Sequence, residues 1–131
     1  MVATKNTSRQ QSRHLPAFVL LLLAKSPMHG GALQGELNSK FPALRIDSAA
    51  VYRTLQQLEK NGELTSQWDT SGNGPAIRIY NLTKVGWEKL AFWEGDIRER
   101  LEYLQAFLSS YGELVKQRPF ASALCAPDDL R

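Results

Sequence analysis

The sequence has little of what covalent or metal-based chemistry requires. Cysteine occurs once among 131 residues, as Cys125, which excludes an intramolecular disulfide and any site built from several thiolates. His14 and His29 stand apart from cysteine and from acidic clusters, so metal-ligand spacing is missing. Nucleophile elbows and phosphate-binding loops are missing too. We therefore expect no metal, no cofactor and no enzyme activity, and the scarcity of cysteine suits a reducing cytoplasm.

Long apolar runs are scarce as well. The one long run, LPAFVLLLLA at residues 15–24, has about half of the roughly 20 residues that a membrane helix needs. It also lacks the small-residue cleavage site of a secretory signal. The run therefore predicts a buried helix, and no membrane is expected as a partner.

The net charge is small, at +3, but the charged residues are unevenly distributed along the chain. Residues 1–60 hold eight basic and three acidic side chains, a net charge of +5, and the remainder carries −2. A basic N-terminal part followed by a slightly acidic C-terminal part fits nucleic-acid binding at one end and assembly at the other. A solvated basic face with no polyanionic partner fits the same distribution.

The N-terminal part predicts two helices. Pro16 suits the first turn of a helix that ends near Lys25. Leu33, Leu37 and Phe41 are four residues apart, which predicts a second, short helix. This helix contains three glycines, each costing up to about 1 kcal/mol relative to alanine, and the close approach of a neighbouring backbone is one reason to tolerate them.

The stretch DSAAVYRTLQQLEKNG, at residues 47–62, predicts an amphipathic third helix over about 48–61. Asp47 or Ser48 can cap it, and Gly62 can take the left-handed conformation that ends it. At 100° per residue, three aliphatic residues fall on one face and the polar residues on the other. The apolar face consists of Val51, Leu55 and Leu58; the opposite face carries Ala49, Arg53, Gln56, Gln57 and Lys60, with Tyr52 at its edge.

After Gly62 the apolar period changes from helical to two. The segments LTSQW and IRIYNLT alternate and are separated by the turn-rich DTSGNGPA. They predict a two-stranded hairpin, which needs helices to pack against because an isolated hairpin is barely stable.

A single long helix is predicted from the capping Thr83 to about Arg118, with one glycine, Gly95, in its middle. Its apolar residues repeat in steps of four and three, as in a heptad seam. A helix of about 30 residues is near 45 Å long, so a second copy of the chain is the expected cover, and a folded-back monomer is the alternative. The seam runs through Ile97, Leu101, Leu104, Leu108, Tyr111 and Val115, and Leu90 and Trp93 extend it upstream with one irregular step.

Three helices followed by a hairpin is the element order of the winged helix-turn-helix. A major groove about 12 Å wide admits one helix, which must be supported on its apolar side and carry long polar side chains on the other. The expected fold is therefore mainly α with a small β-hairpin. Its parts are a flexible basic arm at 1–13, a winged helix-turn-helix at 14–83, a dimerisation helix at 84–118 and a flexible tail at 119–131.

The chain also resembles the PadR-like family of transcriptional regulators over about residues 15–95. The resemblance rests on SPMHG, DSAAVYRTLQQLEKNGEL and GPAIRIYNLTKVGWEKL, in this order. It implies a dimeric DNA-binding repressor of the short subtype with a single C-terminal helix. Two departures stand out: Gly31 and Ala32 replace the family's usual aromatic and acidic residues, and Arg53 stands where a proline often follows the tyrosine.

Side-chain chemistry suggests individual roles on double-stranded DNA. Arg53, Gln56 and Gln57 suit base edges, and Ser48 and Lys60 suit phosphates. Tyr52 suits either a phosphate contact or a half-buried place in the core. The wing is the predicted hairpin with its loop. A phosphate could be met there by Asn73, by the backbone around Gly72 and Gly74, and by the charge of Arg78. The alternatives are a solvated helix face and an ordinary surface hairpin. The predicted DNA-binding set is Ser48, Ala49, Tyr52, Arg53, Gln56, Gln57, Lys60, Asn73 and Arg78.

Two further features remain open. Lys5, Arg9 and Arg13 of the arm either follow the DNA or make no contact. Trp87, Phe92 and Trp93 lie where two copies would pack; the resemblance implies a pocket for a small aromatic or hydrophobic effector there, and core packing is the other interpretation.

The sequence thus predicts a cytoplasmic, non-enzymatic regulator that binds a palindromic operator as a homodimer. The resemblance implies that it is a repressor, and release by a hydrophobic effector stays open. The rival hypothesis is a winged-helix module that binds protein partners without DNA. Salt separates the two, because phosphate contacts weaken steeply as salt rises.

Overall fold

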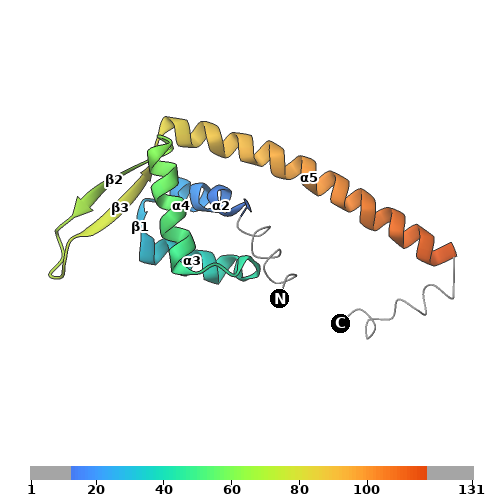
Figure 1. Ribbon diagram of the computed structural model, residues 1–131, viewed down its shortest axis with the longest axis horizontal. Helices are drawn as coiled ribbons and strands as arrows, with labels where there is room; N and C mark the ends of the chain where they lie inside the picture. The colour runs from blue at the N-terminus through green and yellow to red at the C-terminus, as the bar shows by residue number, and fades with distance from the viewer. Residues whose placement is uncertain (1–12, 118–131) are drawn as a thin grey trace. The chain divides into compact units, whose positions relative to one another are not determined.

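The computed structural model describes residues 13–117, and the predicted arm and tail therefore lie outside the described residues apart from Arg13, which is exposed. Figure 1 shows a mainly helical chain with a small sheet and a long C-terminal helix, which confirms the predicted fold class. The elements are α2 (Leu15–Lys25), β1 (Met28–His29), α3 (Gly30–Lys40), the 3-10 helix η1 (Pro42–Leu44), α4 (Ser48–Lys60), β2 (Leu64–Asp69), β3 (Ile77–Leu82) and α5 (Lys84–Gln117).

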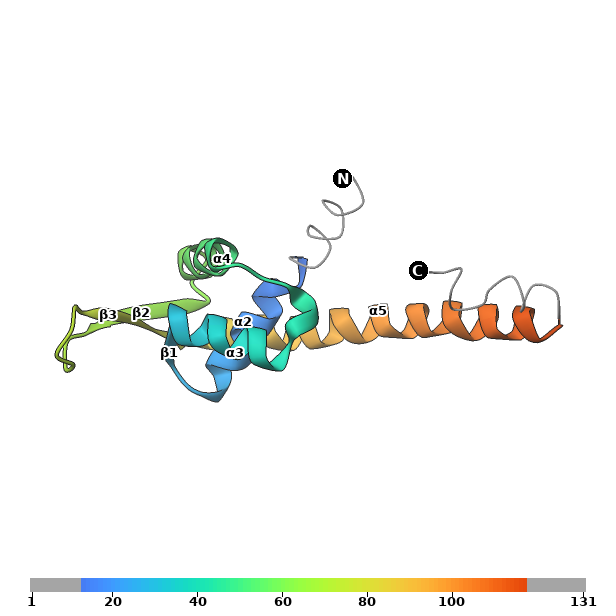
Figure 2. The same cartoon turned by 90° about the horizontal axis from the view of Figure 1, so that it is seen from below.

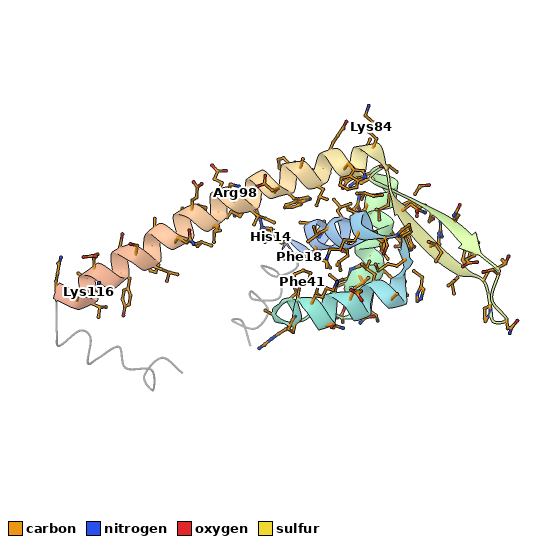
Figure 3. The ribbon with its side chains drawn as sticks, turned by 180° about the vertical axis from the view of Figure 1, so that it is seen from behind. His14, Phe18, Phe41, Lys84, Arg98 and Lys116 are labelled. Atoms are coloured by element: carbon orange, nitrogen blue, oxygen red, sulfur yellow. The ribbon has the colours of Figure 1, made fainter. Side chains whose placement is uncertain are left out.

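The core of the first compact unit, which ends at Trp93, is built around α2. This helix is apolar on nearly all sides, begins with Pro16 in its first turn and buries most of its residues. Figure 2 shows α4 end-on beside α2 and α3. Phe18 of α2 packs against Phe41, the C-cap residue of α3, with 4.7 Å between the ring centroids (Figure 3). The fully buried side chains are Leu15, Val19, Leu20, Leu22, Leu33, Leu37, Val51 and Leu55.

The sheet has three strands in the order β1-β3-β2, and both pairings are antiparallel. The predicted hairpin is confirmed as β2 and β3, with Ser66 opposite Tyr80 and Trp68 opposite Arg78. The prediction of only two strands was incomplete, because Met28 and His29 form β1 against β3. Two residues show no period of their own, so the alternation rule does not detect them. This short strand connects the α2–α3 link to the wing.

The start of α5 packs tightly on the residues that precede β2. The hydroxyl of Thr83 accepts a hydrogen bond from the Gly86 N–H at 3.0 Å and donates one to the Gly62 carbonyl at 2.6 Å, so Thr83 caps the helix as predicted. Gly86 is buried, and a Cβ atom there would collide with the Glu63 carbonyl oxygen. Besides the mid-helix Gly95, α5 contains Gly86 near its start and Gly112 near its end.

Within residues 13–117, no helix combines the length and the apolar character that crossing a bilayer requires.

Replacing Gly86 with alanine should lower the free energy of unfolding by about 1 to 3 kcal/mol, because a backbone carbonyl leaves no room for the added methyl group. Gly35→Ala is the matched control: it also adds a methyl to a helical glycine, but nothing lies within 4 Å of that position. The control should raise stability by up to about 1 kcal/mol. Urea denaturation followed by circular dichroism measures both, and equal effects would contradict the tight packing at Gly86.

Candidate nucleic-acid interface

The candidate interface is built on α4, whose two ends are fixed by short-range interactions. The Asp47 carboxylate accepts a hydrogen bond from the Ala50 N–H at 2.8 Å, so of the two predicted caps Asp47 is the one used. Gly62 adopts a φ of 82°, the left-handed conformation that ends the helix. The predicted helix over about 48–61 is thus confirmed as Ser48–Lys60.

The two faces of α4 divide as the sequence predicts. Val51, Leu55 and Leu58 are buried in the core, and Thr54 is half-buried beside them. The opposite face is open to solvent and carries every predicted DNA-binding residue of this helix. These exposed residues are Ser48, Ala49, Tyr52, Arg53, Gln56, Gln57 and Lys60.

The polar side chains of this face differ in how much they interact within the protein. The Gln57 side-chain N–H donates to the Asn61 side-chain oxygen at 3.0 Å, so part of its hydrogen-bonding capacity is used. Among residues 13–117, Arg53, Gln56 and Lys60 form no side-chain hydrogen bond or ion pair. Their donors and acceptors are therefore available to a ligand.

Tyr52 lies at the junction of α4 and α3. Its side chain is 45% exposed, and its ring fills the space where a Cβ atom of Gly30 would stand. The close approach expected at the glycines of α3 is therefore made by a side chain, and the expectation of a neighbouring backbone was wrong. Gly30 is needed here because any larger residue would displace the ring.

The wing tip is shaped by Asp69. Its carboxylate accepts hydrogen bonds from the Ser71 N–H at 3.0 Å and from the Ser71 hydroxyl at 2.7 Å. Both bonds lower the pKa of Asp69 below its ordinary value, and the bond from the hydroxyl has the larger effect. Asn73 and its neighbours Gly72 and Gly74 are exposed. The tip is thus an exposed loop that the Asp69–Ser71 bonds hold at its start.

Arg78, predicted as a charge on the wing, is engaged within the protein. Its Nε donates to the Ser66 hydroxyl at 2.8 Å, and its guanidinium lies 3.6 Å from the Glu59 carboxylate. The Ser66 hydroxyl donates to the same carboxylate at 2.7 Å. The guanidinium also lies 5.4 Å from the centroid of the Trp68 ring. Sequence reasoning missed Ser66, which the register of the hairpin brings to Arg78, and Glu59, which the packing of α4 beside β2 brings there.

A pocket of about 260 Å³ lies where the wing meets the helices. Tyr80 at its base is buried, and burial raises the pKa of its hydroxyl above the ordinary value, while Arg78 opposes this shift and Glu59 adds to it. The pocket is lined by His29, Gly30, Tyr52, Trp68, Ile77, Arg78 and Tyr80.

The predicted seam of α5 falls on both compact units. In the first unit, Leu90 and Trp93 pack against the core, and the ring of Trp93 meets His14 edge to face at 5.9 Å. In the second unit, which begins at Glu94, the leucines are open: Leu104 is 55% and Leu108 65% exposed. Of the remaining seam residues, Ile97 and Val115 are half-buried, and Leu101 and Tyr111 are exposed.

The aromatic residues of the predicted effector pocket have different environments. Trp87 and Phe92 are exposed, whereas Trp93 is half-buried. The Phe92 ring lies 5.8 Å from that of Trp93, and the Lys89 ammonium sits 4.7 Å from the Phe92 ring centroid. In the part of the chain that the structure describes, no three His, Cys, Asp or Glu side chains could share a metal ion.

Comparison with known proteins places the chain among transcription factors. The family model described as "Transcriptional regulator PadR-like family" matches residues 19–92. A PadR family transcriptional regulator from Eggerthella lenta superposes with a TM-score of 0.66 at 23% identity, covering 82% of this chain and 92% of that one. A PadR-like regulator from Bacillus cereus gives a TM-score of 0.67 at 18% identity, with coverages of 76% and 96%.

A further similar structure is Bacillus subtilis PadR, solved in complex with operator DNA. Its TM-score is 0.56 at 22% identity, and the match covers 60% of this chain but 45% of that protein. At these identities the three structures establish the shared fold. No curated protein matches the sequence.

Proposed function

Because the chain belongs to the PadR-like family of transcriptional regulators, we propose that it is a sequence-specific repressor that binds a palindromic operator as a homodimer. The observation that carries this proposal is the division of α4, whose aliphatic face is buried while its cationic and amide face is open. A helix supported in this way fits the major groove. The operator complex of Bacillus subtilis PadR supports the assignment through the shared fold.

In this proposal α4 is the recognition helix, and its side chains that form no bond within the protein are the ones that read bases. Arg53 has the planar donor pair that matches guanine, and Gln56 has the donor and acceptor that match adenine. Ser48, Tyr52 and Lys60 contact phosphates and set the register. Asn73 and the backbone of the wing tip meet a phosphate beside the groove. In this scheme residues 14–83 are the DNA-binding domain.

The homodimer forms through the open seam of α5, within the proposed dimerisation helix at 84–118. Leucines exposed by half or more of their surface along successive turns are costly to leave in water. A second copy covers them symmetrically. Two recognition helices then enter successive major grooves about 34 Å apart, which requires a palindromic site.

An apolar effector is the proposed means of release. The exposed rings of Trp87 and Phe92 offer flat surfaces on which an aromatic molecule stacks. Trp93, whose ring lies beside that of Phe92, packs against the core. Binding there would alter the start of α5. Quenching of tryptophan fluorescence by a panel of flat aromatic compounds is the direct assay.

Selection from random duplex DNA should recover one palindromic sequence, because two symmetric recognition helices read the same half-site twice. The affinity for that sequence should fall steeply as salt rises from 50 to 200 mM, since several phosphate contacts release counterions. Electrophoretic mobility shifts measure both. Failure to enrich any sequence, with binding of protein partners that is insensitive to salt, would favour the protein-interaction module.

Replacing Arg53 with alanine should weaken binding to the selected operator by about 1 to 3 kcal/mol and relax the preference at one base pair. Lys116→Ala, which removes the same charge from an exposed position of α5, serves as the control and should bind like the original protein. If the Arg53 variant keeps both its affinity for the operator and its discrimination against random duplex, Arg53 does not read a base.

Introducing glutamate at both Leu104 and Leu108 should raise the dimer dissociation constant by about 100-fold or more, because two charges would be buried against their symmetry mates. The matched control is Gln105→Glu with Ser109→Glu, which adds the same charge beside the seam. Analytical ultracentrifugation distinguishes the species. A dimer that withstands the leucine changes would rule out this seam as the interface.

A further inference from the structure

A group of polar side chains connects the wing to the end of the recognition helix. We call this group the wing clamp; it consists of Glu59 on α4, Ser66 on β2 and Arg78 on β3. Ser66 donates to the Glu59 carboxylate at 2.7 Å and accepts from Arg78 at 2.8 Å, so its hydroxyl bridges the two charged groups. The carboxylate also lies 3.6 Å from the guanidinium.

The clamp engages the Nε–H donor of Arg78 and places a carboxylate beside its guanidinium. The ion pair is partly shielded from solvent, with the Glu59 side chain 31% and the Arg78 side chain 45% exposed. Trp68, directly opposite Arg78 in the hairpin, adds its ring to the guanidinium. The Glu59 carboxylate thus offsets part of the charge that Arg78 would otherwise offer to a phosphate.

The wing needs such a connection because its outer part has little core beneath it. Trp68 is 62% and Ile77 42% exposed, and residues 70–76 between the strands are all exposed. Leu64 and Tyr80 hold the inner part of the hairpin in the core, whereas hairpin residues without such packing are marginally stable. The clamp joins it to α4 by side-chain bonds that need no hydrophobic contact.

We propose that the wing clamp sets the position of the wing relative to the recognition helix, and that Arg78 and Glu59 act on DNA as positioning residues. This inference rests on the proposed DNA-binding function. It reverses the role predicted for Arg78, which then acts through the wing and makes no phosphate contact. It also gives Glu59, an acidic residue on the DNA-binding helix, a reason to be there.

The proposal and simple electrostatics predict opposite effects at Glu59. Removing a negative charge near a polyanion should by itself strengthen binding. If the carboxylate holds the wing, its removal frees the hairpin and weakens binding, because the wing must then be ordered when DNA binds. The sign of the change is therefore diagnostic.

The test measures operator affinity over a range of salt concentrations for Glu59→Gln, Arg78→Ala, Arg78→Lys and the double variant Glu59→Gln/Arg78→Ala. Each single change should weaken binding about 3- to 10-fold with an unchanged salt slope. The double variant should lose no more than the weaker-binding single variant. Arg78→Lys should behave like the alanine variant, because an ammonium lacks the planar fork that engages Ser66 and Glu59 together. Glu36→Gln, which breaks the exposed pair with Lys40 on α3, is the control and should bind normally.

Three outcomes would overturn the proposal. These are tighter binding by Glu59→Gln, a salt slope reduced by about one phosphate contact in Arg78→Ala, and full affinity in Arg78→Lys. Amide hydrogen exchange without DNA gives an independent readout: protection over residues 64–82 should fall in Glu59→Gln and in Arg78→Ala and stay unchanged in Glu36→Gln. If the original protein binds no duplex DNA, the proposed function fails, and the exchange experiment alone decides whether the clamp holds the wing.

Discussion

The structure depends on the burial of one aliphatic edge of α4 against α2. Val51 and Leu55 have no exposed surface, and α2, which is apolar around most of its circumference, packs against α4. Each such side chain contributes about 1.5 to 3 kcal/mol when it leaves water. Because this edge is fixed, the opposite edge needs no support from its own side chains. Arg53, Gln56 and Lys60 are therefore free to extend into solvent, and their freedom is a consequence of the core.

Much of this arrangement could be predicted from local rules. The caps at Asp47 and Thr83, the left-handed Gly62 and the change of period after it are written in consecutive residues, and the structure follows them. Interactions between segments that are distant in the sequence could not be predicted from such local rules. Gly86 looks like an ordinary helix glycine until Glu63 is placed beside it. Arg78 looks like a free cation until the hairpin register and the position of Glu59 are known.

The seam of α5 shows how a regular pattern can serve two environments. Its apolar positions continue across the boundary between the two compact units with one irregular step, but Leu90 and Trp93 pack on the core while Leu104 and Leu108 are exposed. Periodicity reports which residues share a face of a helix. What covers the face depends on the rest of the fold. Spacing alone thus assigned one role to residues that the structure divides.

The pairing of β1 with β3 bears on how the chain folds. Met28 lies opposite Tyr80, across a loop of about fifty residues that contains α3, α4 and β2. Closing so long a loop has an entropic cost that local helix and hairpin contacts do not share. The third strand should therefore join the sheet late, after the helices have collapsed. The pairing of β1 with β3 would then fix the wing to the helices in the same step that completes the domain.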